Sequence, residues 1–331
     1  MRDVAERAGV SFKTVSRVVN DEGGVSDDLV VRVRQAVELL GYRRDDRARR
    51  LRQGARTGTI GFVLVDVANP FFSAILRGIE EVARSEEYLV FSGSSDGIED
   101  RQNQLVEAFV ARRVDGLIVV CSGPGSGSLG HEVDRGTPVV FLDLEPERLD
   151  SDLVRSDHRG GAALATRHLR EHGHRDIAFF GDEATVFSAR LRLDGYRDAM
   201  KEGRLEIAEG RVVHGRHSSD VWRRMISEYL ARNDPPTAIF TGQNFITIGA
   251  AQALHDLELR ETIAHVGFDD VELADVVRPG ISVVPQHPLD LGKRAAELLF
   301  ARLAGSTAPF IREIVPASII RRGSGEILPY R

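Results

Sequence analysis

The sequence predicts an α/β protein with an N-terminal helix-turn-helix head of three helices and a larger body of two doubly wound parallel sheets. Its first residues contain two short amphipathic helical patterns separated by a glycine. From Thr57 onward, short β-branched and aromatic runs alternate with amphipathic helical patterns, which is typical of parallel sheets covered by helices on both faces. This part, about 270 residues long, exceeds what one core usually supports, so we expect two subdomains.

Residues 3–20 predict a helix, a tight turn and a second helix. Apolar residues recur at helical spacing in the first helix, and Gly9 permits the backbone conformation of a sharp stop. Ser11 is placed to cap the second helix with its hydroxyl. In that helix the valines face inward, and the outer face carries Phe12, Lys13, Ser16 and Arg17. This is the geometry of a helix that enters the major groove of DNA, although a two-helix corner inside a globular domain gives the same pattern.

A third helix completes the head within residues 1–42. Ser26 is a candidate cap, and Asp27 and Asp28 follow in the first turn, where the helix dipole favours carboxylates. Gly41 ends the helix. The expected buried stripe consists of Val30, Val33, Val37 and Leu40.

Residues 43–56 predict an arginine-rich linker, because they contain too few apolar side chains to fold alone. We expect the linker to become helical when another molecule neutralises its charges. Residues 1–56 contain 13 Lys and Arg and 9 Asp and Glu, a net charge of +4, whereas the whole chain carries −6. The rest of the chain therefore carries −10, and this asymmetry favours a head that contacts phosphate.

The composition excludes several classes of protein. No apolar run approaches the ~18 residues that a membrane-spanning helix needs, and the N-terminus lacks the pattern of a secretory signal. Cys121 is the only cysteine, so an intrachain disulfide is impossible. These features predict a cytoplasmic protein.

The body, residues 57–331, is expected to bind a ligand between its two subdomains. In open α/β sheets, ligands bind beyond the carboxyl ends of the strands. The segment Ser122–Gly130 lacks the lysine of a phosphate-binding loop and is interpreted as a flexible loop. The expected strands are Ile60–Val65, Tyr88–Ser92, Gly116–Val120, Pro138–Leu142, Ile177–Phe180, Ala238–Phe240, His265–Phe268 and Ser282–Val284. The expected helices are Phe72–Arg84, Gln102–Arg112, Gly160–Glu171, Leu191–Glu202, Val221–Asn233 and Ile246–Leu257.

Five motifs, taken in order, resemble those of the LacI/GalR family of bacterial transcription regulators. The resemblance covers nearly the whole chain and implies a periplasmic-binding-protein-like body, which also serves dimerisation. It implies a homodimer on a pseudo-palindromic operator in double-stranded DNA and a small-molecule effector between the lobes, with no enzyme activity and no cofactor. The motifs are Asp3–Asn20, Ala68–Phe72, Val114–Ile118, Arg192–Tyr196 and Val266–Asp270.

The resemblance implies DNA contacts in the head and the linker. Lys and Arg side chains can bind guanine O6 and N7, and an aromatic side chain can contact a thymine methyl. The positions that match base-reading residues are Phe12, Lys13 and Arg17; Thr14 and Ser16 match phosphate contacts, and Asn20 ends the motif. In the linker, Ala48 and Leu51 match the hinge helix of the family.

In that hinge helix the leucine inserts into the minor groove and kinks the DNA. The alternative for Leu51 is that it covers the surface of the body. The chain carries Arg44-Asp45-Asp46 where the family usually has Pro-Asn, so the hinge lacks the rigid start that proline provides, although Asp45 can cap it.

The resemblance also implies an effector site between the lobes. Carboxylates accept paired hydrogen bonds from sugar hydroxyls, arginine donates a fork of N–H groups, and phenylalanine offers a flat apolar face to a ring. The matching positions are Phe72, Asp143, Ser188, Arg192, His217, Gln243 and Asp269.

Two departures bear on the effector. The chain has Gln243-Asn244 where the family commonly has Asn-Asp, and His217 beside Arg216 where an aromatic wall is common. The loss of a carboxylate and the added positive charge favour a sugar acid or a sugar phosphate over a neutral sugar or nucleoside. The alternative is that Arg216 and His217 are solvent-facing loop residues.

Other chemistries have weaker support in the sequence. His168, His172 and His174 lack a cysteine or carboxylate at metal-ligand spacing, and Gly173 is interpreted as a helix end between two surface histidines. Ser188, His217 and Asp269 lack the Gly-x-Ser-x-Gly turn of a hydrolase. A transport-type sugar-binding protein would carry a signal peptide and no basic head. We therefore predict a ligand-responsive repressor, with a corepressor-dependent regulator bound by a nucleobase or nucleoside as the alternative.

Overall fold

The computed structural model describes residues 1–20, 22–42, 56–123, 127–143, 150–215 and 218–330. The chain divides into two compact units, Met1–Thr57 and Gly58–Arg331, and each is described by itself. The described part contains no helix that is both long and apolar enough to cross a membrane.

The described part of the first unit contains three helices around a small apolar core. Ser11 precedes α2 as its cap, and its Oγ accepts a hydrogen bond of 3.1 Å from the Thr14 amide, as the sequence predicts. Ser26 occupies the same position before α3 but makes no side-chain capping bond. The expected burial of Leu40 is wrong, because Leu40 is 46% exposed and Ala36 lies in the core in its place. The helices are α1 (Arg2–Ala8), α2 (Phe12–Val19) and α3 (Asp27–Leu39).

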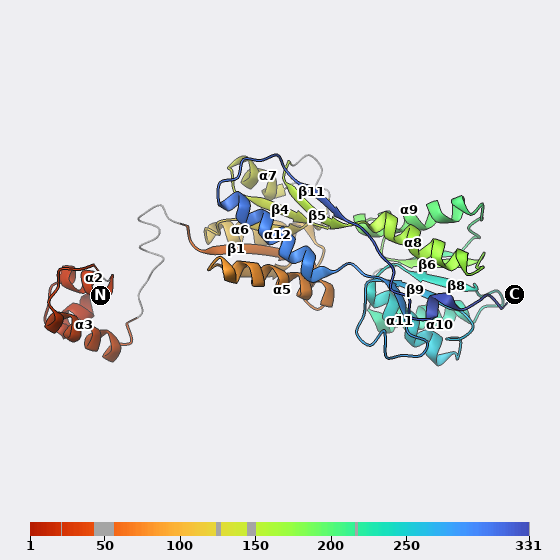
Figure 1. The fold of residues 1–331 in the computed structure, drawn as a ribbon, viewed down its shortest axis with the longest axis horizontal. Helices are drawn as coiled ribbons and strands as arrows, with labels where there is room; N and C mark the ends of the chain where they lie inside the picture. The colour runs from red at the N-terminus through yellow and green to blue at the C-terminus, as the bar shows by residue number, and fades with distance from the viewer. Residues whose placement is uncertain (21, 43–55, 124–126, 144–149, 216–217, 331) are drawn as a thin grey trace. The chain divides into compact units, whose positions relative to one another are not determined.

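The first lobe of the body is a six-stranded parallel sheet with helices on both faces (Figure 1). The strand order is β11-β5-β4-β3-β1-β2, so the last strand of the chain lies at one edge. The strands are β1 (Thr59–Leu64), β2 (Leu89–Ser94), β3 (Leu117–Val120), β4 (Val139–Leu142), β5 (Asp152–Ser156) and β11 (Arg312–Val315). The helices are α5 (Pro70–Ser85), α6 (Glu99–Ala111), α7 (Gly127–Asp134) and α12 (Pro288–Leu303).

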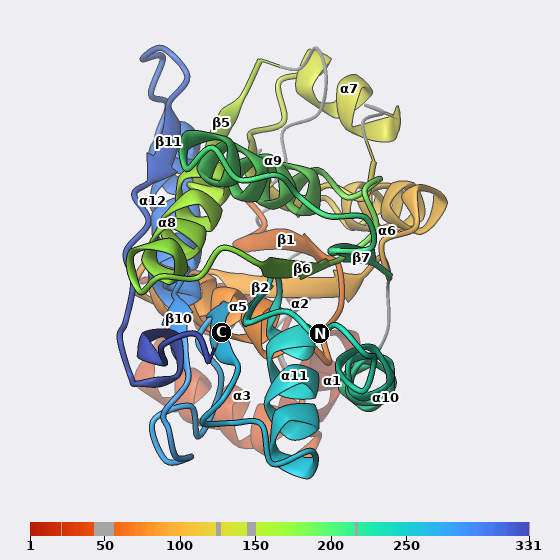
Figure 2. The same ribbon diagram turned by 90° about the vertical axis from the view of Figure 1, so that its right-hand side faces the viewer.

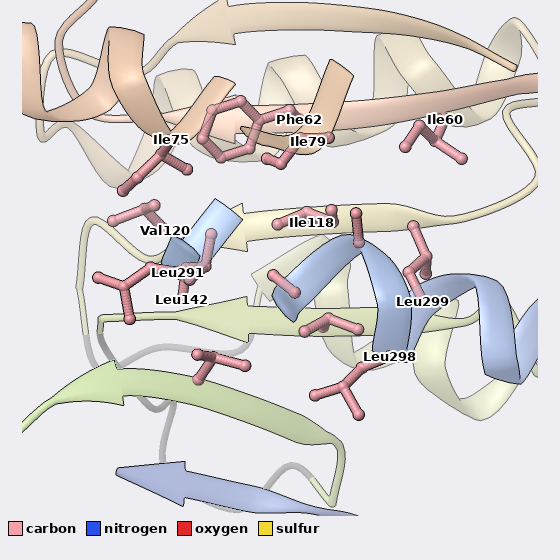
Figure 3. Close-up of a cluster of buried hydrophobic side chains, with 14 of the residues drawn as sticks. Ile60, Phe62, Ile75, Ile79, Ile118, Val120, Leu142, Leu291, Leu298 and Leu299 are labelled. Carbon is pink, nitrogen blue, oxygen red and sulfur yellow. The ribbon is translucent and has the colours of Figure 1, made fainter. Parts of the chain in front are cut away.

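A buried cluster between this sheet and the helices α5 and α12 forms the main core of the lobe. Figure 3 shows leucines of α12 beside isoleucine and phenylalanine side chains of β1, β3 and α5. The two helices approach closely at glycines: a Cβ on Gly78 would lie 2.1 Å from the Leu289 carbonyl oxygen, and one on Gly292 would lie 2.2 Å from that of Ile75. Only glycine allows this contact between the two backbones.

The second lobe is a five-stranded parallel sheet of order β10-β9-β8-β6-β7. Figure 2 shows α8 and α9 on one side of β6 and α10 and α11 on the other. The strands are β6 (Ile177–Gly181), β7 (Val212–His214), β8 (Ala238–Thr241), β9 (Ala264–Phe268) and β10 (Ser282–Val284). The helices are α8 (His158–Glu171), α9 (Phe187–Glu202), α10 (Ser219–Leu230) and α11 (Asn244–Asp256), with a short 3-10 turn η1 (Ser324–Glu326) near the end.

The chain crosses between the lobes three times. It passes from β5 to α8, returns from β10 to α12, and leaves β11 for a segment that bridges Ile320 to Val283 of the second sheet. Two doubly wound lobes with a three-helix head confirm the predicted fold class. The sequence did not predict β5, β7, α12 or β11. The prediction of a loop over Ser122–Gly130 is partly wrong, because α7 begins at Gly127.

Candidate functional site

The outer face of α2 is exposed in the head. The side chain of Phe12 is 54% exposed, and Lys13 and Arg17 are exposed on the same helix. Thr14 is half-buried, and its hydroxyl lies 2.9 Å from that of the capping Ser11. The helix therefore presents one large aromatic and two cationic side chains from a capped N-terminus, an arrangement that fits a DNA groove.

The second helix ends in a local hydrogen bond. Asn20 donates from Nδ2 to Ser16 Oγ over 3.2 Å, so these two predicted DNA residues are held together on one turn. The predicted hinge residues Ala48 and Leu51 lie outside the described residues, as does His217 in the body.

Two carboxylates lie directly beyond buried strands of the body, one in each lobe. Asp143 follows β4 and Asp269 follows β9, and both adopt left-handed backbone angles, with φ of 63° and 74°. A non-glycine residue rarely adopts this conformation and tends to do so at functional sites. The predicted pair of carboxylates is thus at the carboxyl ends of parallel strands, where α/β proteins bind ligands.

Asp143 is joined to Arg192 through His158. Asp143 Oδ1 lies 2.5 Å from His158 Nε2, and Arg192 Nε and Nη2 lie 3.4 and 3.3 Å from His158 Nδ1. Because an arginine can only donate, Nδ1 accepts and the ring proton on Nε2 points to Asp143. Burial acts to raise the pKa of Asp143, but its interaction with His158 and the charges of Arg192 and Arg155 hold the pKa below its ordinary value.

Arg192 itself is only 4% exposed and has three protein partners. Besides His158, its Nη1 donates to the Gly242 carbonyl over 2.6 Å, and its guanidinium carbon lies 4.3 Å from the centre of the Phe268 ring. Much of its hydrogen-bonding capacity is therefore already used inside the body.

Asp269 is held by groups from two other segments. Its Oδ2 accepts a 3.2 Å bond from the Asn244 amide, and its Oδ1 accepts one from Gln286 Nε2. Burial raises the pKa of Asp269, against the opposing effects of Arg192, Gln286 and Asn244. The other amide atom, Gln286 Oε1, is buried without a partner among the described residues, so it is available to a ligand hydroxyl.

A pair of asparagines joins the lobes at this level. Asn69 caps α5 by accepting from the Phe71 amide over 3.0 Å, and Asn244 Nδ2 donates to the same Asn69 oxygen over 2.6 Å. Both asparagines are buried. Asn69, Asn244, His158 and Gln286 were not among the predicted site residues, although Asn69 lies within the motif Ala68–Phe72 and Asn244 within the Gln243-Asn244 departure from the family pattern.

The other predicted effector residues lie in three different environments. Phe72 is 9% exposed and belongs to the first-lobe core, with its ring 5.2 Å from that of Phe71. Gln243 caps α11, because its Oε1 accepts from the amides of Phe245 and Ile246. Ser188 lies half-buried in the first turn of α9.

The predicted surface position of the histidine cluster is wrong for His174, which is fully buried. His174 Nε2 lies 2.7 Å from the Ile327 carbonyl oxygen, and the neighbouring His168 Nε2 lies 2.6 Å from Glu326 Oε1. Burial lowers the pKa of both rings. These histidines therefore attach the C-terminal segment to the second lobe, and no group of metal-binding residues is found in the described part of the chain.

Two family models match the chain. Residues 1–45 match bacterial regulatory proteins of the lacI family, and residues 166–325 match a periplasmic binding protein-like domain. The ribose operon repressor of Escherichia coli (strain K12) is 34% identical over 333 residues, which cover 98% of this chain and 99% of the repressor. The chain belongs to the LacI family of bacterial regulatory proteins.

Further similarity to LacI-family proteins extends over the whole length. The HTH-type transcriptional repressor PurR of Pasteurella multocida (strain Pm70) is 31% identical over 97% of both chains. A solved structure of the lac repressor dimer bound to operator and the anti-inducer ONPF superposes with a TM-score of 0.80 at 25% identity, covering 98% of both chains. This LacI-family chain is a DNA-binding transcription regulator, which confirms the predicted family and regulatory function.

Proposed function

We propose that the chain acts in the cytoplasm as a homodimeric repressor whose affinity for a pseudo-palindromic operator changes when a small molecule binds between the lobes. Residues 1–42 form the DNA-binding head, residues 43–56 the hinge, and residues 57–331 the body that binds effector and dimerises. The observation that carries the proposal is the capped, exposed outer face of α2. The proposed DNA contacts are Phe12, Lys13, Thr14, Ser16, Arg17, Asn20, Ala48 and Leu51.

The operator can be identified by selection of duplexes from a random pool with the full chain. Two heads related by a two-fold axis should select inverted repeats whose half-sites are about 10 base pairs apart, or a multiple of that spacing. Arg17→Ala should weaken binding to the selected duplex by ~1–3 kcal/mol and lose discrimination against random DNA. Arg17→Lys keeps the charge without the planar fork and is the matched control.

Selected sequences without two-fold symmetry would refute the dimeric operator. Unchanged discrimination by Arg17→Ala would remove Arg17 from base recognition. For the hinge, Leu51→Ala should reduce both the bend of the operator and the affinity, and an unaltered bend would exclude the leucine wedge.

The proposed effector contacts are supported by the two carboxylates beyond β4 and β9 and by the residues that hold them. Asp269→Ala should abolish the response to ligand, while the ligand-free chain still binds the selected duplex. A variant that responds at the same ligand concentration as the parent chain would remove Asp269 from the site. The full set of proposed contacts is Phe72, Asp143, Ser188, Arg192, His217, Gln243 and Asp269.

The sign of the response separates the two kinds of effector. An inducer lowers the affinity for operator, and a corepressor raises it by the same linkage. Relatives of the chain are named ribose operon repressor or PurR. Titration of the chain–operator complex with pentoses and with purine bases therefore tests both alternatives.

A further inference from the structure

The first turn of α9 carries an aromatic ring with two arginines beside it. Phe187 is the first residue of this helix. The guanidinium carbon of Arg155, from β5 of the first lobe, lies 5.8 Å from the centre of the Phe187 ring, and that of Arg190 lies 5.5 Å from it. Two cations from opposite lobes therefore meet around one side chain.

One donor atom of Arg155 is unpaired among the described residues. Its Nε is buried and has no hydrogen-bond partner within the described residues. The charge of Arg155 acts to lower the pKa of Asp143, whose carboxylate lies 2.5 Å from His158 Nε2. A buried cationic donor without a partner is costly, so an acceptor supplied by a ligand would be stabilised at this position.

The backbone at this position also favours negative charge. Val186 precedes α9 without a side-chain cap, and the first turn contains no acidic residue. The positive end of the helix dipole and the Ser188 hydroxyl thus lie beside the two arginines.

We propose that the ligand of the cleft carries an anionic group, a carboxylate or a phosphate, which binds Arg155 and Arg190 at the start of α9. The inference rests on the proposed effector-binding function. Arginine forks bind both groups through paired hydrogen bonds. Asp143 and Asp269 accept hydroxyls at the other end of the ligand, so the chemical class is a sugar acid or a sugar phosphate.

The test uses matched trios of ligands on the full chain. Ribose, ribonate and ribose 5-phosphate, and glucose, gluconate and glucose 6-phosphate, are titrated by calorimetry at low and high salt. One anionic member should bind tenfold or more tightly than its neutral parent, because hydrogen bonds to charged groups contribute roughly that factor or more. Tighter binding of ribonate or gluconate would identify a carboxylate, and tighter binding of ribose 5-phosphate or glucose 6-phosphate would identify a phosphate.

Variants assign the effect to the two arginines. Arg155→Gln should reduce the affinity for the anionic ligand to the affinity measured for the neutral sugar. Arg190→Gln should also reduce the affinity for the anionic ligand, and because the Arg190 side chain is exposed, the melting temperature should not change. Arg197→Gln is the matched control, because Arg197 lies on the same helix with a side chain that is 55% exposed. This variant should bind as the parent chain does.

Three results would overturn the inference. They are equal affinity for neutral and anionic members, an unchanged preference in Arg155→Gln, and failure of every anionic member to bind at millimolar concentration. Operator binding is measured in parallel. If a neutral sugar releases the operator, the proposed function stands and the anion site is refuted. If an anionic ligand binds without changing the affinity for operator, the anion site stands and the link between ligand binding and operator affinity is refuted.

Discussion

Replacement of Arg192 by methionine tests whether this proposed effector contact also stabilises the body. Methionine keeps most of the apolar stem and removes the guanidinium. The variant loses the 2.6 Å bond to the Gly242 carbonyl, the contacts with His158 and the stacking on Phe268.

The expected loss of stability follows from these contacts. A hydrogen bond from a charged donor contributes about 1.5–3 kcal/mol, and a desolvated cation–π contact about 1–2 kcal/mol. We therefore expect the free energy of unfolding of the body to fall by about 3 kcal/mol. For a body of this size that loss lowers Tm by about 6–12 °C.

Thermal and urea unfolding of the ligand-free full chain measure the effect, with Arg197→Met as the control on the exposed side of α9. Arg197→Met should change the unfolding free energy by less than about 0.5 kcal/mol. A loss below about 1 kcal/mol in Arg192→Met would refute the reasoning, because it would mean that the three contacts contribute almost nothing in the folded chain.

Three further predictions concern the cap, the helix contact and the buried carboxylate. Ser11→Ala should destabilise the head by ~1 kcal/mol in thermal unfolding, whereas Ser26→Ala, which removes no capping bond, should cost a few tenths at most. Gly78→Ala should destabilise the body by ~2–3 kcal/mol because its Cβ would meet the Leu289 carbonyl oxygen. Gly23→Ala, which has open space around it, should not destabilise the chain. Equal effects of the two variants would contradict the close contact between α5 and α12. Burial raises the pKa of Asp269 in the folded state above its ordinary value of 3.8. The folded chain is therefore most stable with respect to this group below pH 3.8, where the carboxyl is neutral, and it loses that stability as the pH rises through the raised pKa. Asp269→Asn should therefore gain stability relative to the parent chain as the pH rises from ~4 to neutrality, and a pH-independent difference in urea unfolding would exclude a raised pKa.

Local features of the sequence determined the head and the ends of the strands. Capping by Ser11 and the turn at Gly9 depend on residues a few positions apart, so the pattern of residues 3–20 was sufficient to predict α1 and α2. Asp143 and Asp269 were predicted from the resemblance to the LacI/GalR family, and the structure places each directly after a short apolar strand.

The tertiary structure decided which distant segments meet. Strand β5 was not predicted because its first residue, Asp152, is a charged residue that is fully buried. Asp152 is paired over 2.7 Å with Arg302 of α12, 150 residues later, and burial of a charge is tolerated only with such a partner.

The network around Asp143 and Arg192 has the same physical origin. His158 contacts Asp143 and Arg192 because the chain passes from the first lobe to the second between β5 and α8, and Asn69 meets Asn244 between the two lobes. No local pattern records these contacts, since hydrogen bonds between segments far apart in sequence depend on the three-dimensional arrangement. The sequence by itself thus determined the family, the helix-turn-helix and the two carboxylates, and the folded body determined the partners that orient them and the arginines beside α9.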